Sequence, residues 1–218
     1  NKYPGIWDFT SIIIDEGQDF DEYHLSLLRV IAEYSDGSYY VFYDKNQLIQ
    51  QRNSLTWVQD IECRLVLTLN CRNTFSIAET SSKAVGVDKV KMRQIVAGEK
   101  PLLKNVSTKE ELIMAMNESI RDLTDSGVTK DRIVILTTKT MERSVLNGTD
   151  KIGNYSLSKE IVKGRILFTT VRKFKGLEAD VVILIDVDGS TFNSDENRRV
   201  FYVGASRAKH LLKIFTML

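Results

Sequence analysis

The sequence has few of the residues that build disulfide frameworks or zinc sites. Of its 218 residues, two are cysteine, Cys63 and Cys71, and two are histidine, His24 and His210. Two cysteines do not make a disulfide framework and suit a reducing compartment, so the expected localisation is cytoplasmic. The histidines lie far apart and have no cysteine beside them, so the sequence does not predict a zinc site.

An excess of charge of one sign and long apolar runs are also lacking. The 30 basic and 29 acidic side chains give a formal net charge of +1. This balance indicates neither a nucleic-acid partner nor a membrane, so any nucleic-acid surface must be a local patch. No apolar run reaches the roughly 18 residues that cross a bilayer. The N-terminus also lacks the apolar segment of a signal peptide, and we expect no membrane partner.

A glycine-rich phosphate loop is missing as well. Such a loop ends in Gly-Lys-Ser or Gly-Lys-Thr, because the lysine and the backbone N–H groups hold the phosphates. None of the 12 glycines is followed by lysine, and the first residue is not methionine. We therefore expect the chain to be the C-terminal part of a longer protein, with the N-terminal remainder as a partner.

A pair of carboxylates directly follows a short apolar run near the start of the chain. The run is 12–14, and Asp15 and Glu16 come next. In α/β sheets, ligands bind beyond the carboxyl ends of the strands. One carboxylate there can hold Mg²⁺ through water, and its neighbour can polarise the attacking water. The pattern predicts the hydrolysis end of a nucleotide site, with Asp15 and Glu16 at the metal.

Apolar runs alternate with amphipathic segments along the chain. The predicted strands are 10–14, 39–43, 64–69, 102–106, 133–137, 165–170, 180–186 and 211–215. The predicted helices are 21–34, 74–85 with Thr74 as its cap, 107–126 with a capping box at 107–110, and 195–208. This alternation predicts an α/β fold with a mostly parallel sheet. The weakest point of the chain is 60–64, where we place a domain boundary.

Polar side chains recur just beyond the predicted strands. Those after the first strands are Asp44, Gln47 and Arg72, and the segment 170–178 lies between two later strands. Three arginines, Arg198, Arg199 and Arg207, are expected on the helix 195–208.

In this order the segments resemble the conserved motifs of superfamily 1 helicases of the UvrD/Rep kind. Residues 15–19 resemble motif II, the Walker B element, and 43–49 resemble motif III. Residues 69–74 resemble motif IV, 170–180 motif V and 198–208 motif VI. The five blocks cover most of the chain, and the last two together are the most specific.

The resemblance implies a RecA-like P-loop NTPase fold, with a mostly parallel sheet flanked by helices. Residues 1–62 would be a partial first RecA-like domain with motifs II and III. Residues 63–218 would be a complete second one with motifs IV, V and VI. The implied function is that of an ATP-dependent DNA helicase or translocase, which couples ATP hydrolysis to movement on single-stranded DNA. Its cofactors would be ATP and Mg²⁺, and its partner single-stranded or partly duplex DNA.

The resemblance also implies roles residue by residue. Asp15 would hold Mg²⁺ and Glu16 would activate water, while Gln47 would sense the γ-phosphate. Arg72 and Arg207 would reach the γ-phosphate, where fixed guanidinium groups stabilise the charge of phosphoryl transfer. The nucleotide would also be held by the motif V residues Gly176 and Glu178, the latter at the ribose. The nucleic-acid contacts would be Thr170, Arg172, Lys173 and Arg52.

Three departures from the family pattern bear on binding. Cys71 stands where the family has a tyrosine that stacks on adenine, which leaves base selectivity open. Arg172 stands where the family has histidine. A base-stacking tryptophan expected near Arg52 is missing, although Trp57 follows. The basic stretch 83–104 is either a solvated face or a further nucleic-acid contact.

Two alternatives stay open at this point. The protein could be an ATPase that regulates a protein complex or a nuclease without unwinding, or a non-catalytic nucleic-acid or protein binding module. If the helicase interpretation holds, Arg72, Glu178 and Arg207 should cluster on one side of the second sheet. We expect that cluster at the carboxyl ends of its strands.

Overall fold

The structure is a computed structural model that describes residues 9–44, 63, 65, 69–87 and 90–218. The chain separates into two compact units, Asn1–Val66 and Leu67–Leu218. This division lies close to the predicted one between residues 62 and 63. The predicted strand 64–69 falls mostly outside the described residues and stays a prediction.

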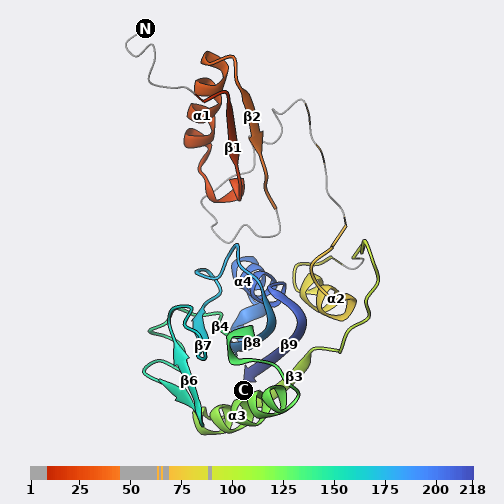
Figure 1. Cartoon of the computed structure of the whole chain (residues 1–218), viewed down its shortest axis with the longest axis vertical. Coiled ribbons are helices and arrows are strands. Elements are labelled where there is room, and N and C mark those ends of the chain that lie inside the picture. The colour runs from red at the N-terminus through yellow and green to blue at the C-terminus, as the bar shows by residue number, and fades with distance from the viewer. Residues whose placement is uncertain (1–8, 45–62, 64, 66–68, 88–89) are drawn as a thin grey trace. The chain divides into compact units, whose positions relative to one another are not determined.

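The described residues of the first unit form a two-stranded parallel sheet, an α-helix and a short 3₁₀ helix (Figure 1). Its elements are β1 Ser11–Ile14, the 3₁₀ helix η1 Gly17–Asp19, α1 Glu22–Tyr34 and β2 Ser38–Val41. Ser11 pairs with Ser38 in the parallel register, so the helix forms the crossover between the strands. The Asp21 carboxylate accepts a hydrogen bond from the His24 N–H at 2.9 Å and caps α1, as its side chain favours. The predicted strand–helix–strand order is confirmed here.

The second unit is built on a seven-stranded sheet with the order β3-β9-β8-β4-β7-β6-β5. The strands are β3 Leu102–Val106, β4 Ile133–Thr137, β5 Lys151–Ile152, β6 Tyr155–Ser158, β7 Ile166–Thr170, β8 Ala179–Val187 and β9 Ala208–Met217. Every pairing is parallel except the one between β5 and β6. The predicted mostly parallel α/β sheet is therefore confirmed.

Helices lie against both faces of this sheet (Figure 1). They are α2 Phe75–Lys83, α3 Lys109–Asp125 and α4 Asp195–Ala205, with the 3₁₀ turns η4 Lys130–Arg132 and η5 Gly189–Phe192. Alternate residues of β8 point to opposite faces. Val181 and Ile183 share a core with Met116 of α3, whereas Leu184 lies under Gly204 of α4. The sheet is thus covered on both sides, as parallel sheets require.

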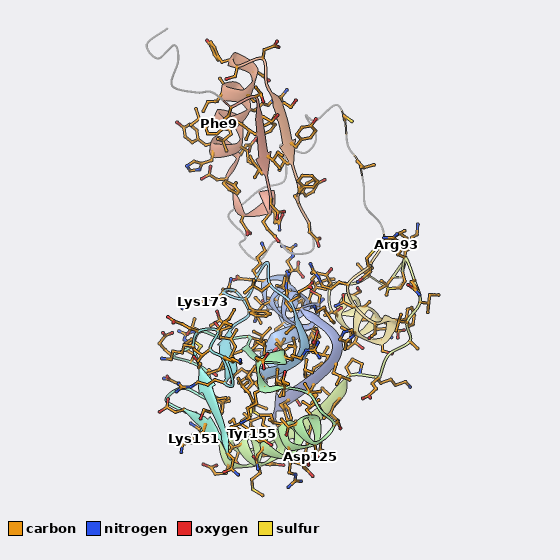
Figure 2. All side chains as sticks on the ribbon, viewed as in Figure 1. Phe9, Arg93, Asp125, Lys151, Tyr155 and Lys173 are labelled. Carbon is orange, nitrogen blue, oxygen red and sulfur yellow. The ribbon has the colours of Figure 1, made fainter. Side chains whose placement is uncertain are left out.

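The far edge of the sheet was not predicted. Strands β5 and β6 form a short hairpin around Gly153, in a region where the sequence predicted no strand. Tyr155, labelled in Figure 2, holds this hairpin to the end of α3, because its hydroxyl lies 3.0 Å from Thr124 Oγ1. The strands are too short for their alternation to stand out in the sequence.

Three predicted helix ends differ in detail. The cap of α3 is Thr108, whose hydroxyl accepts from the Glu111 N–H at 3.1 Å, while the Glu111 carboxylate accepts from the Ser107 N–H at 2.8 Å, so the cap lies one residue after the predicted one. Thr74 precedes α2 but makes no side-chain cap, since the first N–H groups of α2 bond to the carbonyls of Val96 and Ala97. The predicted helix 195–208 ends at Ala205, because the chain turns there into β9.

None of the helices in the described part of the chain combines the length and the apolarity that a membrane span needs.

Substituting Gly204 by alanine should destabilise the second unit. The added Cβ would lie 2.7 Å from Val171 Cγ2 and 2.9 Å from Leu184 Cδ1, both on buried side chains. Overpacking of this kind costs about 1–3 kcal/mol, which exceeds the gain in helix propensity. Urea denaturation would measure it, with Gly189→Ala as the control, because a Cβ on Gly189 meets nothing within 4 Å. Equal stability of the two variants would contradict the tight contact between α4 and the sheet.

Candidate functional site

The predicted carboxylate pair lies at the carboxyl end of β1, as expected. Asp15 is exposed and Glu16 is half-buried. Glu16 adopts a left-handed backbone, with φ 54° and ψ 40°, which costs a non-glycine residue roughly 1–2 kcal/mol. The chain therefore turns sharply at Glu16, and both carboxylates lie just beyond the end of β1.

Gln18 is a residue of this site to which the sequence assigned no role. Its side chain is completely buried. Its Nε2 donates to Glu16 Oε2 at 2.5 Å, and its Oε1 accepts from the Asp44 N–H at 3.0 Å. Gln18 thus joins the carboxylate of motif II to the segment after β2, where motif III begins. Its only signal in the sequence was an amide between two acidic residues.

The carboxylates fit part of a Mg²⁺ site. Mg²⁺ usually takes one or two protein carboxylates and completes its octahedron with water and phosphate oxygens. Asp15 and Glu16 can supply that number. Among the described residues, no group of three or more His, Cys, Asp or Glu side chains is placed to enclose a metal. The predicted site residues Gln47 and Arg52, like Trp57, lie outside the described residues.

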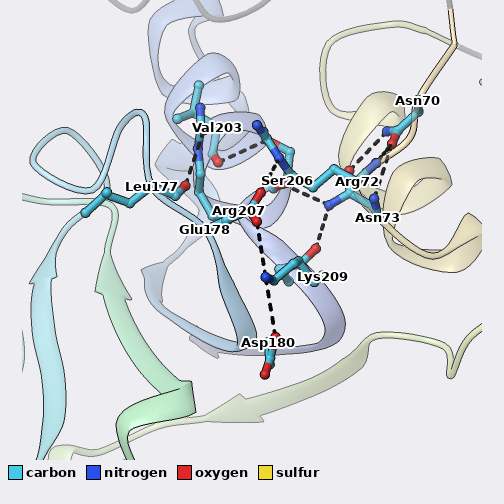
Figure 3. A network of polar contacts seen from close by, with 11 residues as sticks. Asn70, Arg72, Asn73, Leu177, Glu178, Asp180, Val203, Ser206, Arg207 and Lys209 are labelled. Carbon is cyan, nitrogen blue, oxygen red and sulfur yellow. Dashed lines mark hydrogen bonds and ion pairs between the residues drawn. The ribbon is translucent and has the colours of Figure 1, made fainter. Parts of the chain in front are cut away.

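In the second unit, three distant segments meet at one place, namely 70–74, 177–180 and 206–209 (Figure 3). Arg72 Nε donates to Glu178 Oε2 at 3.0 Å. Lys209 Nζ lies 3.1 Å from Glu178 Oε1 and 3.7 Å from Asp180 Oδ1. One carboxylate therefore holds two cations, one from the segment 70–74 and one from the segment 206–209.

These contacts shift the ionisation of both partners. The hydrogen bond from Lys209, followed by the charges of Lys209 and Arg72, lowers the pKa of Glu178 against the opposing effect of desolvation. The hydrogen bond and the charge of Glu178 raise the pKa of Lys209. The side chain of Glu178 is 43% exposed, so solvent screening keeps the energy of this pair small. The pair orients the side chains more than it stabilises the fold.

Asn73 locks the backbone of the same cluster. It is 7% exposed, and its Nδ2 donates to the carbonyls of Ser206 at 2.9 Å and Ala208 at 2.5 Å. Asn70 Oδ1 in turn accepts from the Arg72 N–H at 3.0 Å. The segment that carries Arg72 is thereby fixed against the turn that carries Arg207.

Arg207 lies in the interior of the cluster, not on the helix where it was predicted. It is 1% exposed and follows the end of α4. Its Nη1 donates to the Leu177 carbonyl at 3.4 Å, and its own carbonyl accepts from the Ala179 N–H at 3.0 Å. Arg72, Glu178 and Arg207 are thus brought together as expected. Arg72 lies at the surface, whereas Arg207 could reach a ligand only by leaving this position.

The prediction that this cluster lies at the carboxyl ends of the strands was wrong. Glu178 directly precedes β8 and Arg207 directly precedes β9, so both lie at amino ends of strands. Thr170, Arg172 and Lys173 do lie at the carboxyl end of β7. The reason is that strands β7 and β8 run parallel, so the loop between them must run from the carboxyl end of β7 to the amino end of β8. With a five-residue β7, the two ends of the strands are about 16 Å apart at roughly 3.3 Å per residue.

The crossing loop 171–178 is held along its length. The Val171 N–H donates to the Thr137 carbonyl at 3.0 Å, and the Phe174 N–H donates to the Thr170 carbonyl at 3.1 Å. Phe174 is buried. Gly176 has φ 84°, a left-handed conformation that glycine adopts without strain and that returns the chain towards β8.

At the carboxyl end, Arg172 is held by an ion pair. Its Nη2 lies 2.7 Å from Glu196 Oε1 at the start of α4. Thr170 is mostly buried and its hydroxyl accepts from the Lys173 N–H at 3.2 Å, while Arg172 and Lys173 are exposed. Among the described residues that are predicted to contact nucleic acid, these two offer charge to solvent.

Asp186 organises a neighbouring loop and was predicted only as a strand residue. It is 2% exposed and has φ 60°. Its carboxylate accepts from Thr137 Oγ1 and Ser144 Oγ, each at 2.6 Å, and from the Val145 N–H at 3.0 Å. A carboxylate that only accepts suits these converging donors. They fix the loop after β4 to the end of β8.

Comparison with known proteins supports the C-terminal part of this assignment. Residues 165–214 match the family described as the UvrD-like helicase C-terminal domain. That range contains Glu178 and Arg207 and spans β7, β8, α4 and most of β9. No curated protein matches the chain. Residues 165–214 are therefore similar to a helicase C-terminal domain.

A solved structure shares the fold. It is the C-terminal domain of a possible DNA helicase from Lactobacillus plantarum WCFS1, with a TM-score of 0.53 and 17% sequence identity. The alignment covers 68% of this chain and 88% of that one. At this identity the similarity supports the fold only.

Substituting Asn73 by alanine should destabilise the second unit by about 1–3 kcal/mol, because the buried carbonyls of Ser206 and Ala208 lose their donor. Chemical denaturation would measure the loss. Asn147→Ala is the control, since Asn147 is exposed and donates one 3.1 Å bond to the Glu142 carbonyl. A loss no larger than that of the control would contradict the locking role of Asn73.

The pKa of Glu178 should be below its ordinary value, and Lys209→Gln should raise it. A lowered carboxyl pKa adds stability above the unfolded-state value, and this stability is lost as the pH falls through the folded-state value. NMR titration of the Glu178 carboxyl carbon would measure the shift, with the exposed Lys151→Gln as the control. An unchanged titration in Lys209→Gln would mean that the ion pair does not persist in solution.

Proposed function

We propose that this chain is the C-terminal portion of an ATP-dependent DNA helicase or translocase that moves along single-stranded DNA. The observation that carries the proposal is the convergence of Arg72, Glu178 and Arg207 from three segments of the second unit. In the family that the sequence resembles, these are the positions that serve the nucleotide. The match of residues 165–214 to the UvrD-like helicase C-terminal domain supports it.

The proposed chemistry is divided between the two units. Bound Mg²⁺-ATP would supply the reacting phosphoryl group, with the metal neutralising its charge. Asp15 would hold the metal, and Glu16, oriented by Gln18, would accept a proton from the attacking water. The hydrogen bond from the buried Gln18 amide would fix the orientation of the Glu16 carboxylate, which could still accept a proton.

Arg72 is the surface cation of the second unit that would reach the γ-phosphate. Its bond to Glu178 uses Nε, and the remaining N–H groups of a guanidinium can donate to phosphate oxygens. Arg207 would act there only after its guanidinium leaves the Leu177 carbonyl. Glu178 would accept from the ribose hydroxyls, and Gly176 permits the turn that presents it.

The crossing loop gives a route for coupling. Thr170, Arg172 and Lys173 would contact the nucleic-acid strand at the carboxyl end of β7, and Glu178 would contact the nucleotide at the other end of the loop. Movement of Glu178 or Leu177 would be transmitted through the packed Phe174 to Lys173. Arg52 and Gln47 are proposed for the nucleic acid and the γ-phosphate from the sequence resemblance alone.

Hydrolysis of ATP by the full-length gene product, with excess single-stranded DNA, tests the proposal. Glu16→Gln should abolish turnover and keep ATP binding, because the base is lost while Asp15 remains. Arg72→Ala should lower kcat by roughly 10³–10⁵, the range for an arginine at a transferred phosphate. Arg121→Ala, an exposed arginine on α3, is the control and should leave kcat within about twofold of wild type.

The outcomes separate the alternatives. Turnover that does not respond to DNA would favour an ATPase that acts on a protein complex or a nuclease. A folded full-length protein that binds ATP or DNA without turnover would favour a binding module. A change below threefold in Arg72→Ala would remove Arg72 from the site. The 218 residues alone should not hydrolyse ATP, since they contain no Gly-Lys phosphate loop.

A further inference from the structure

Three loops of the second unit leave the sheet at the same level, at the carboxyl ends of β4, β7 and β8. Thr137, the last residue of β4, lies opposite Thr170 of β7 and Ile185 of β8 in the parallel register. The Val171 N–H donates to the Thr137 carbonyl at 3.0 Å, and the Thr138 N–H donates to the Ile185 carbonyl at 3.3 Å. The residues that directly follow these three strands are therefore neighbours in space.

Two of these loops carry cations, and the segment after β8 carries carboxylates. Lys139 lies two residues after β4, while Arg172 and Lys173, the latter labelled in Figure 2, follow β7. Asp188 directly follows β8, and Glu196 lies in the first turn of α4. The proposed function gives no role to Lys139 or to either of these two carboxylates.

Two of the cations form close ion pairs with these carboxylates. Arg172 Nη2 lies 2.7 Å from Glu196 Oε1, and Lys139 Nζ lies 2.8 Å from Asp188 Oδ2. All four side chains keep contact with solvent, so screening makes each pair a small contribution to stability. The consequence is greater for binding. A phosphate that contacts Arg172 or Lys139 has to replace a carboxylate that already offers the same kind of oxygen.

The backbone around Asp188 fixes its carboxylate. Its Oδ1 accepts from the Ser190 N–H at 2.8 Å as the cap of η5, while its Oδ2 lies against Lys139. Burial opposes the ionisation of Asp188, but the hydrogen bonds from Lys139 and Ser190 outweigh it and lower its pKa. The loop that carries Lys139 is fixed as well, because Ser144 Oγ donates to the Asp186 carboxylate at 2.6 Å.

The third cation, Lys173, interacts with a carboxylate less directly. A hydrogen bond from its own backbone N–H, followed by one from Thr140, lowers the pKa of Glu142. The charges of Lys173 and Lys159 lower it further, after an opposing effect of desolvation. The two close pairs are therefore the contacts that a bound anion would have to break.

Helix capping alone does not require this arrangement. Asp188 caps η5 and Glu196 lies at the start of α4, and both positions favour acidic residues. A cap needs the oxygen of Asp188, which asparagine also has, and the charge of Glu196 would act on the helix wherever its side chain pointed. Neither role needs the carboxylate to lie against Lys139 or Arg172.

We propose that Asp188 and Glu196 set the affinity of this surface for a nucleic-acid strand, because they occupy Lys139 and Arg172. This role rests on the proposed function, which has the strand at the carboxyl end of β7, and it adds Lys139 to the contacts of the strand. A phosphate gains little by replacing a single carboxylate. A strand therefore binds well only when it engages both loops together and displaces both carboxylates.

Fluorescence anisotropy of labelled oligothymidylate with the 218-residue chain tests this role. Asp188→Asn and Glu196→Gln keep the size of each side chain and one oxygen acceptor, and they remove the charge. Each should tighten binding about threefold, as exposed ion pairs allow. The double variant should tighten it at least about tenfold, which corresponds to about 1.4 kcal/mol. The gain should shrink as the salt concentration rises, because phosphate contacts depend on salt.

The matched control is Glu118→Gln. Glu118 is an exposed carboxylate of α3 whose Oε2 lies 3.4 Å from Lys104 Nζ, so this variant makes the same change of charge elsewhere on the second unit. Its affinity for the oligonucleotide should stay within about twofold of wild type, since salt screens a charge that the strand does not touch. A gain equal to that of Glu196→Gln would overturn the proposal, because net charge alone would then explain the effect.

A double-mutant cycle shows whether the gain acts through the cations. Glu196→Gln should no longer tighten binding in an Arg172→Gln background, and Asp188→Asn should lose its effect in a Lys139→Gln background. A gain that persists in these backgrounds, or unchanged or undetectable binding in the double carboxylate variant, would overturn the proposal. ATP hydrolysis by the full-length protein that still responds to DNA would then leave the proposed function standing, so the two failures are separate results.

Discussion

The candidate site of the second unit depends on the hydrogen bonds that the buried Asn73 amide donates to the carbonyls of Ser206 and Ala208. These bonds join residues 133 and 135 positions apart in the sequence. They leave Arg72 at the surface beside Glu178 and place Lys209 on the other side of the same carboxylate. The exposed ion pairs are too weak to assemble this cluster. The buried amide and the backbone ladder of β8 and β9 assemble it, and the ion pairs then orient the side chains.

The parallel sheet explains why the predicted site residues of one loop lie at opposite ends of the strands. The loop 171–178 must run from the carboxyl end of β7 to the amino end of β8, so its two ends lie at opposite ends of the strands. Gly204 allows α4 to pack directly on Val171 at the start of this loop, and Phe174 is buried in its middle. Val171 and Phe174 therefore anchor the loop to the core, while most of its other residues are exposed.

Much of this fold could be predicted because its signals are local. Strands β3 and β4 coincide with the predicted 102–106 and 133–137. The continuous apolar run of β4 marks a buried strand, whereas in β3 only Val106 is buried. The carboxylates Asp15 and Glu16 lie where the run 12–14 ends. The hairpin of β5 and β6 was missed because two- and four-residue strands carry too little pattern.

What could not be predicted depends on pairing between distant segments. The strand end at which Glu178 lies follows from the direction of the strands in the folded sheet. The prediction of a carboxyl end assumed that every motif follows a strand. Asn73 and Asp186 gave no signal, because an amide or carboxylate looks the same in sequence whether its partners are water or buried donors. The burial of Arg207 has the same origin. A guanidinium that is 1% exposed is tolerated when carbonyls face it, and the Leu177 carbonyl does so. In this position Arg207 holds the residue before Glu178, so moving its guanidinium would release the end of the loop 171–178 that precedes β8.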